Sequence, residues 1–80
     1  MILFMTNSPS WGSRLRAQRQ KAGLSQDALA ELCECHQTAI SLIESDTNRP
    51  GDLLKVRLAR ALEVDPAELF PLSDLVEVGE

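Results

Sequence analysis

The sequence lacks the features of a membrane protein and of a disulfide-stabilised secreted domain. Its 80 residues contain no apolar run of the about 18–20 residues that a membrane-spanning helix needs. The apolar opening MILFM is shorter than the core of a secretory signal, and no positive charge precedes it. The two cysteines, Cys33 and Cys35, are too few and too close together for a disulfide framework. We therefore expect a soluble protein of the cytoplasm that has no membrane partner.

Residues that serve catalysis or bind metal ions are also scarce. There is no tyrosine, and the one histidine, His36, has no recognisable nucleophile or carboxylate arrangement around it. A domain of this size has little mass with which to enclose an active-site pocket. Cys33, Cys35 and His36 offer three ligands, but no second cluster completes a tetrahedral metal site. The sequence predicts no enzyme, no cofactor and no metal site. We interpret the cysteines as small apolar residues, with redox or metal sensing as the alternative.

The charge of the chain is negative overall but unevenly distributed. The net charge of −4 argues against a nucleic-acid binder, because such domains are usually basic. Between Ser13 and Ala22, however, there are four basic residues and no acid, whereas from Glu63 onward there are six acids and no base. We expect a polarised molecule in which the local field matters more than the total charge.

Capping signals and apolar spacing predict an all-α domain of four or five short helices. The expected helices cover residues 11–22, 26–33, 36–45, 53–62 and 66–70. Ser10 and Ser25 precede the first two as N-caps, and Gly23 follows the first at a position that favours glycine. In the third helix, Ile40 and Ile43 are the residues expected to face inward. The stretch before the fourth helix, 46–52, is rich in turn-forming residues and is expected to be a loop.

The second and third predicted helices are joined by only about three residues, which is the spacing of a helix-turn-helix. The segment GLSQDALAELCECHQTAISLIES resembles the Cro/phage-repressor (XRE-type) helix-turn-helix family. The similarity continues outward through WGSRLRAQRQKAGLSQ and LARALEVDPAELF, so it covers Trp11 to about Pro71. The resemblance implies a compact, lambda-repressor-like DNA-binding domain over residues 10–71. Residues 1–9 are expected to be a flexible leader, with a β-arm that pairs with a partner chain as the alternative.

The resemblance also implies which side chains contact double-stranded DNA. The positions that match base-contacting residues of the family, on the third helix, are Gln37, Thr38, Ser41 and Leu42. The positions expected to contact the sugar-phosphate backbone are Arg16, Gln26, Asn48 and Arg49. A glutamine can bond adenine through two hydrogen bonds, and a helix start such as that at Gln26 favours a phosphate. Arg19 and Glu44 match positions that form an internal salt bridge.

Some residues depart from the family pattern. Glu34 and Glu63 stand where glycine is usual, and at Glu34 a left-handed conformation would cost about 1 kcal/mol. His36 stands at an N-cap position that usually holds serine or threonine. Asp52 and Lys55 fall at positions that are usually apolar, which predicts a rotated or shifted start of the fourth helix.

The sequence thus predicts a sequence-specific transcriptional regulator, most simply a repressor, that binds an operator-like site as a homodimer. An acidic tail, 72–80, continues an apolar series that begins at Leu69, and we expect this series to supply the dimer contact. The alternative is a protein-interaction module of the same fold, such as an antitoxin that binds a toxin. A third helix without lysine or arginine, and a Leu42 expected to be exposed, favour that alternative.

Overall fold

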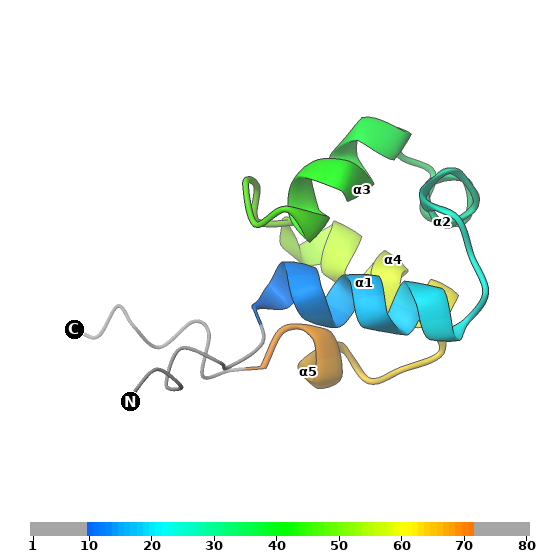
Figure 1. The fold of residues 1–80 in the computed structure, drawn as a ribbon. Helices are drawn as coiled ribbons and strands as arrows, with labels where there is room; N and C mark the ends of the chain where they lie inside the picture. The colour runs from blue at the N-terminus through cyan, green and yellow to red at the C-terminus, as the bar shows by residue number, and fades with distance from the viewer. Residues whose placement is uncertain (1–9, 72–80) are drawn as a thin grey trace, which may run out of the picture.

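The computed structural model describes residues 10–71, which form five helices without a strand (Figure 1). The helices are α1 (Trp11–Lys21), α2 (Gln26–Cys33), α3 (Gln37–Glu44), α4 (Asp52–Leu62) and α5 (Pro66–Leu69). The predicted all-α class is confirmed, and every predicted helix is present within a residue or so of its expected ends. None of the helices in the described range has the length and apolar character needed to cross a membrane. The predicted leader, 1–9, and the tail, 72–80, lie outside the described residues.

Three helices begin at side-chain caps, two of which, Ser10 and Ser25, the sequence predicted. The hydroxyl of Ser10 accepts the backbone N–H of Ser13 at 3.1 Å, and that of Ser25 accepts Ala28 N–H at 3.0 Å. The carboxylate of Asp65 caps α5 in the same way. Each cap satisfies a backbone donor that the first turn of a helix leaves unpaired, and so fixes where the helix starts.

Three helices end in a residue with left-handed backbone geometry. Gly23 has a φ of 76°, while Glu34 and Glu63 both have φ 58° and ψ 44°. After each glutamate, the next backbone N–H bonds at 3.0 Å to a carbonyl five residues earlier. These bonds satisfy carbonyls at the helix end, but the Cβ of a glutamate is strained there. The strain predicted for Glu34 is therefore present, and it recurs at Glu63.

The core lies where all five helices meet. Its fully buried side chains are Leu15, Leu29, Cys33, Ile40, Ile43, Leu58 and Leu69. Ala30 is buried in α2, the helix that packs on α3, and its small side chain suits that close packing. Leu69 and Phe70 are also buried, so these two members of the C-terminal apolar series complete the core instead of offering a dimer surface. The remaining members lie outside the described residues.

The start of α4 differs from the predicted start by one residue. Asp52 is the first residue of the helix and is exposed, whereas Leu53 was expected to begin it. The side chain of Lys55 is only 16% exposed, and its Nζ lies 5.7 Å from the centroid of the Phe70 ring and 4.0 Å from Asp52 Oδ1. The aliphatic stem of a lysine can pack as an apolar residue while its charge contacts a ring face. This is how a polar residue is accommodated at a usually apolar position.

Candidate nucleic-acid interface

Helix α3 has one buried and one exposed face. Ile40 and Ile43 are 0% and 2% exposed and anchor the helix on the core, as their spacing predicted. Gln37 and Thr38, at the start of the helix, are exposed. The inward residues therefore determine which side chains the helix presents to solvent.

Farther along α3, the exposure of the predicted contact residues decreases. Ser41 is half-buried, and Leu42 is half-buried too, so the prediction that Leu42 is exposed is wrong. The chain that follows the helix turns back toward this residue. The backbone N–H groups of Thr47 and Asn48 both bond to the Leu42 carbonyl, at 2.9 and 3.2 Å. The loop thereby folds back over this end of α3.

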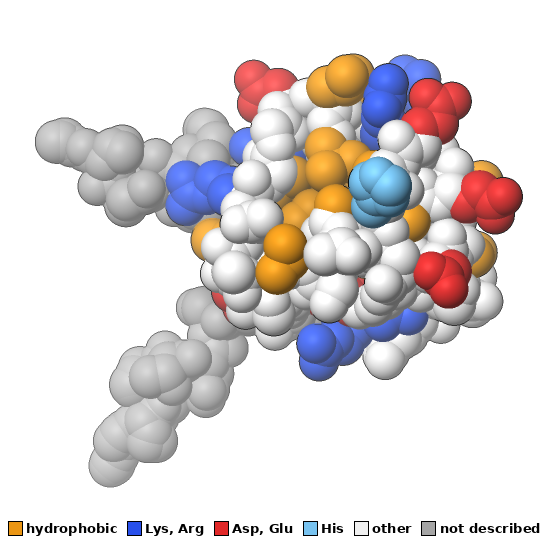
Figure 2. Space-filling view, turned by 90° about the horizontal axis from the view of Figure 1, so that it is seen from above, with side chains coloured by type: hydrophobic (Ala, Val, Ile, Leu, Met, Phe, Trp, Pro, Cys, Tyr) orange, Lys and Arg blue, Asp and Glu red, His pale blue; other side chains and the backbone are white. Residues whose placement is uncertain are grey.

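The face that carries α3 has His36 near its centre, among uncharged side chains (Figure 2). His36 is the N-cap of α3, with φ −82° and ψ 150°, but its side chain makes no capping hydrogen bond. Lysine and arginine side chains lie at the edges of the face seen in Figure 2 and not at its centre. Acidic side chains lie at the edges of this face too, so charge of both signs surrounds its uncharged centre.

A buried carboxylate lies at the other end of α3. The side chain of Glu44 has no exposed surface, and Arg19 of α1 donates to both of its oxygens. Arg19 Nε lies 2.6 Å from Oε2, and Nη2 lies 3.0 Å from Oε1. The structure therefore brings together the two residues that the sequence suggested as a salt bridge. Arg16 Nε also lies 3.5 Å from Oε1, although the Arg16 side chain is 53% exposed.

The ionisation of Glu44 follows from these partners. Burial by itself would raise the pKa of a carboxyl group, because it removes water from the charged form. Hydrogen bonds from Arg19 and Gln26, together with the charge of Arg19, outweigh burial and hold the pKa of Glu44 below its usual value. The hydrogen bond to Glu44 likewise raises the pKa of Arg19. The pair is charged at neutral pH.

Gln26 and Gln37 extend this network to the surface. Gln26 is the first residue of α2, and its Nε2 donates to Glu44 Oε1 at 3.1 Å. Gln37 is the first residue of α3, and its Nε2 donates to Gln26 Oε1. Gln26, which was expected to contact the DNA backbone, thus holds Gln37, which was expected to contact a base.

A close contact between α1 and α3 involves a glycine whose role the sequence analysis missed. A Cβ atom added to Gly12 would lie 2.4 Å from the carbonyl oxygen of Glu44 and 2.7 Å from that of Ile43. The Gly12 N–H donates to the carboxylate of Asp46 at 2.9 Å, and Asp46 itself has a φ of 63°. An isolated glycine inside a helical pattern was the available signal for such a close approach.

The loop after α3 is held against the start of α1. Trp11 Nε1 donates to the Asn48 carbonyl at 3.1 Å, and the guanidinium of Arg49 lies 5.0 Å from the centroid of the Trp11 ring. Asn48 and Arg49 are both exposed. These contacts thus hold Asn48 and Arg49, the two loop residues predicted to contact the DNA backbone, in defined positions.

Comparison with known proteins agrees with this geometry. A family model described as a helix-turn-helix domain matches residues 11–72. The chain belongs to the Cro/phage-repressor helix-turn-helix family. The family and the similar structures consist of DNA-binding regulators and not of enzymes. Among curated proteins, no sequence matches.

Two solved structures are similar to this helix-turn-helix protein. One is the restriction-modification controller protein C.AhdI from Aeromonas hydrophila, with 35% identity, a TM-score of 0.72 and coverage of 75% of this chain and 91% of the other. The second is the DNA-binding domain of the P22 c2 repressor, with 31% identity and a TM-score of 0.77. That match covers 81% of this chain and 86% of the other.

The two cysteines of the helix-turn-helix do not form a ligand cluster. Cys33 is buried, and burial raises the pKa of its thiol to about 11. Burial also raises the pKa of the half-buried Cys35. Protonated thiols are poor metal ligands and nucleophiles. Within residues 10–71, no group of three or more histidine, cysteine or acidic side chains is arranged to hold a metal ion.

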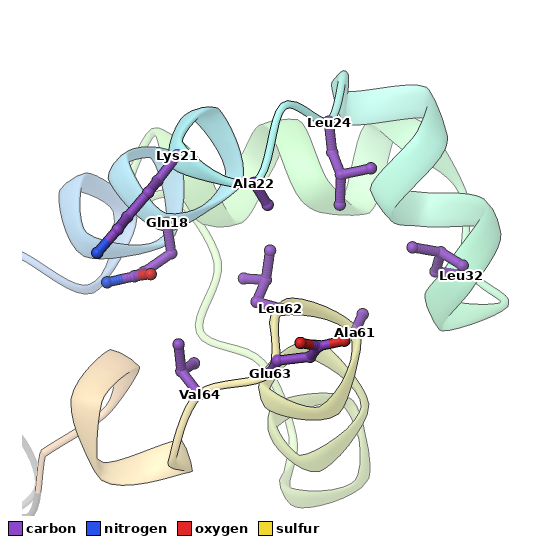
Figure 3. Close-up of a pocket in the computed structure, with 9 residues that line it drawn as sticks. All are labelled: Gln18, Lys21, Ala22, Leu24, Leu32, Ala61, Leu62, Glu63 and Val64. Carbon is purple, nitrogen blue, oxygen red and sulfur yellow. The ribbon is translucent and has the colours of Figure 1, made fainter.

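A groove of about 500 Å³ lies on another side of the domain, between the C-terminal end of α1, helix α2 and the end of α4 (Figure 3). Its lining residues are Gln18, Lys21, Ala22, Leu24, Leu32, Ala61, Leu62, Glu63 and Val64. Leu32 is 58% exposed and also lines an adjoining hollow of about 340 Å³. The sequence analysis did not identify this groove, whose lining is partly polar and partly apolar.

Proposed function

We propose that this protein is a sequence-specific transcriptional regulator, acting as a repressor, that inserts α3 into the major groove of DNA. The observation that carries the proposal is the contrast between the two faces of α3. Ile40 and Ile43 anchor the helix, while Gln37 and Thr38 project from its exposed start. An α-helix fits the major groove, and helix-turn-helix proteins contact base edges with the N-terminal part of the second helix.

In this proposal, the residues of α3 contribute unequally to base recognition. Gln37 makes the principal contact, and Thr38 bonds a base or packs its methyl group against thymine. Ser41 and Leu42 are one turn farther along and half-buried, so their contacts are smaller. The exposed part of Leu42 fits the methyl group of a thymine.

The backbone contacts come from residues around α3. Arg49 is exposed, and its contact with the Trp11 ring holds its charge at the surface without neutralising it. Asn48 lies beside it in the loop, while Arg16 and Gln26 both lie next to Glu44. Contacts to phosphate position a protein on DNA, whereas contacts to base edges provide specificity.

The lack of positive charge on α3 favours binding as a homodimer. Helix α3 carries no lysine or arginine, so one copy would have few charge contacts with DNA. Two copies related by a twofold axis would contact half-sites about 10 base pairs apart, and a preformed dimer would combine their binding energies. We propose that the apolar residues beyond Pro71 supply the dimer contact. The similarity to a controller protein and to a phage repressor supports the repressor role.

A protein-interaction function is the second candidate, and a specific surface favours it. Leu32, Leu53 and Val56 are 58%, 63% and 43% exposed, and Leu32 borders the groove of Figure 3. Leu53 and Val56 are three residues apart on α4 and so lie on one side of that helix. Exposed apolar side chains that gather in a patch often mark a protein contact. An antitoxin would combine such a contact with DNA binding.

Selection of bound sequences from random DNA tests the proposed function. We expect a single preferred half-site, and Gln37→Ala should lower discrimination at one base pair by about 1–3 kcal/mol. Arg49→Ala should weaken binding evenly across sequences and reduce its salt dependence. Gln20→Ala, an exposed position on α1, is the control and should change neither property. Selection of no sequence, or binding that salt does not weaken, would favour the protein-interaction function.

The homodimer is tested separately by sedimentation at tens of micromolar. We expect a dimer that a truncation after Pro71 converts into a monomer. A full-length protein that sediments as an 8.8 kDa monomer, and whose association state the truncation does not change, would contradict the proposed dimer.

A further inference from the structure

The loop that follows α3 is fastened to the first residue of α1. The indole Nε1 of Trp11 donates to the Asn48 carbonyl at 3.1 Å. Pro50, two residues after Asn48, is buried, and a residue that precedes a proline has a restricted backbone. Arg49 lies between these two anchored neighbours, so the position of its backbone is defined in the free protein.

The side chain of Arg49 is held by the same indole. Its guanidinium carbon lies 5.0 Å from the centroid of the Trp11 ring, within the range of a cation–π contact. Among residues 10–71, no carboxylate forms an ion pair with Arg49. Asp46, three residues earlier in the loop, accepts from the backbone of Gly12 instead. The ring therefore restrains a cation whose charge remains available to a ligand.

This arrangement prepares Arg49 for a phosphate. The residue is exposed, and a contact with a ring face leaves most of its five N–H donors free. These donors form a planar fork that matches two oxygens of one phosphate. A mobile arginine loses side-chain freedom when it binds, and a side chain that is already restrained loses less. The indole therefore lowers the entropic cost of a contact that it does not itself make.

We propose that Trp11 is a positioning residue of the DNA interface, which holds Arg49 in place for a phosphate of the DNA backbone. This inference rests on the proposed function, because it requires that Arg49 contacts DNA. The contact between Trp11 and Arg49 is a property of the free protein, so it can be tested without DNA.

Fluorescence tests the contact in the free protein, because Trp11 is the only tryptophan of the chain and there is no tyrosine. Arg49→Ala uncovers the ring face, so acrylamide, a neutral quencher, should quench the emission more steeply than in the wild type. Arg60→Ala is the matched control, because it removes an exposed arginine from α4 and should leave the quenching unchanged. Equal quenching in the wild type and in Arg49→Ala would overturn the proposal, whatever the DNA results show.

A double-mutant cycle tests the positioning role on DNA. Contacts to phosphate do not depend on sequence, so affinity is measured for a duplex of random sequence at low salt. We expect Trp11→Leu to weaken binding by about threefold to tenfold in the wild type, but by less than about twofold in Arg49→Ala. A Trp11 that only stabilised the fold would weaken binding equally in both backgrounds, and that result would overturn the proposal.

The variant Trp11→Phe separates the ring from its N–H group. It retains an aromatic face for Arg49 but has no donor for the Asn48 carbonyl, so we expect an affinity between those of the wild type and Trp11→Leu. Trp11 also packs partly against the core, so circular dichroism must show that each variant is folded. If Trp11→Leu does not fold, Trp11→Phe takes its place in the cycle. An affinity of folded Trp11→Phe as low as that of Trp11→Leu would contradict the role assigned to the ring.

The two measurements separate failure of this inference from failure of the proposed function. If quenching shows the contact but the wild type binds no DNA, the proposed function is contradicted, and the positioning role with it. If the wild type binds DNA and Arg49→Ala binds it equally well, the phosphate contact of Arg49 and this inference are contradicted, while DNA binding itself stands.

Discussion

The two ends of helix α3 differ in how they are attached to the rest of the domain. At the C-terminal end, a buried Glu44 is paired with Arg19, and Gly12 lets α1 approach the backbone closely. At the N-terminal end, His36 provides no side-chain cap, and Gln37 is exposed. One end holds the helix in place, and the other leaves polar groups available to a ligand.

This difference separates two kinds of substitution. Changes at the fixed end remove a buried charge or create a clash, so they should lower the free energy of unfolding. Changes at the exposed end disturb few internal contacts, so their effects on folding should be small or even stabilising. The predictions below test this separation, from the largest expected effect to the smallest.

Glu44→Ala should cost the most stability. It leaves the guanidinium of Arg19, whose side chain is 13% exposed, without its carboxylate partner. Breaking a buried ion pair from one side costs about 3–5 kcal/mol, a large part of the stability of a small domain. Urea denaturation measures the loss. Glu31→Ala, at an exposed position on α2, is the control and should change stability by less than about 0.5 kcal/mol. A loss below about 1 kcal/mol in Glu44→Ala would refute this assignment.

Gly12→Ala should be the next most harmful change. The new Cβ would meet the Glu44 carbonyl oxygen at 2.4 Å, and backbone atoms cannot move aside as a flexible side chain can. Overpacking of this kind costs about 1–3 kcal/mol, even though alanine favours helix. Gly51→Ala is the matched control, because a Cβ there meets nothing within 4 Å. Equal urea midpoints for the two variants would show that the approach of α1 to α3 is not tight.

Acid should lower the free energy of unfolding through Glu44 by less than Glu44→Ala does. The pKa of Glu44 is lower in the folded protein than its ordinary value of 4.5, so the folded state binds fewer protons. The stabilisation is complete above the unfolded pKa, and it is lost as the pH falls through the lower folded pKa. Unfolding free energies between pH 7 and pH 3 measure this. Glu44→Gln should show a shallower fall with pH, and parallel curves would contradict the role assigned to Glu44.

His36→Ser should stabilise the exposed end. The N-cap residue already has the extended backbone that a capping serine needs, but no side chain accepts the free N–H groups of α3. A serine cap is worth about 0.5–1 kcal/mol, which in a domain of this size raises Tm by several degrees. Ser25→Ala makes the opposite change at α2, where the cap is present, and should lower Tm by a similar amount. A lower Tm in His36→Ser would mean that the histidine has another structural role.

Glu34→Gly should have the smallest effect, a gain of a few tenths to about 1 kcal/mol. The left-handed backbone at this position strains any residue with a Cβ. The ion pair lost with Arg57 is 3.9 Å long and largely exposed, so it contributes little. Glu63→Gly, with the same backbone angles at the end of α4, provides the comparison. Thermal melting checks both, and a lower Tm in both variants would contradict the strain assigned to these positions.

Local signals in the sequence predicted the helices and the faces of α3 well. Ser10 and Ser25 cap their helices through bonds to residues three positions away, so the signal and its effect lie together in the chain. The same holds for Ile40 and Ile43, whose spacing alone gives an inward face. These features depend on the geometry of a single helix.

Predictions that depended on contacts between distant segments were less successful. Leu42 was expected to be exposed, but it is half-buried, which the spacing within α3 did not predict. The packing of Lys55 depends on the Phe70 ring, 15 positions away in the sequence. Neither the contact of Arg49 with Trp11 nor the need for glycine at position 12 follows from neighbouring residues. No pattern within one helix carries such information.

The sequence by itself determined that this protein is all-helical, where its helices begin, and which face of α3 is buried. These properties arise from capping and apolar spacing, which act over a few residues. Only the tertiary structure decided how Gln26, Gln37 and Glu44 are connected. Their hydrogen bonds join the starts of two helices to the end of one of them, across 18 and 11 positions of the chain. Such bonds exist only after the core has brought the helices together, so the amide that Gln37 presents is a consequence of packing.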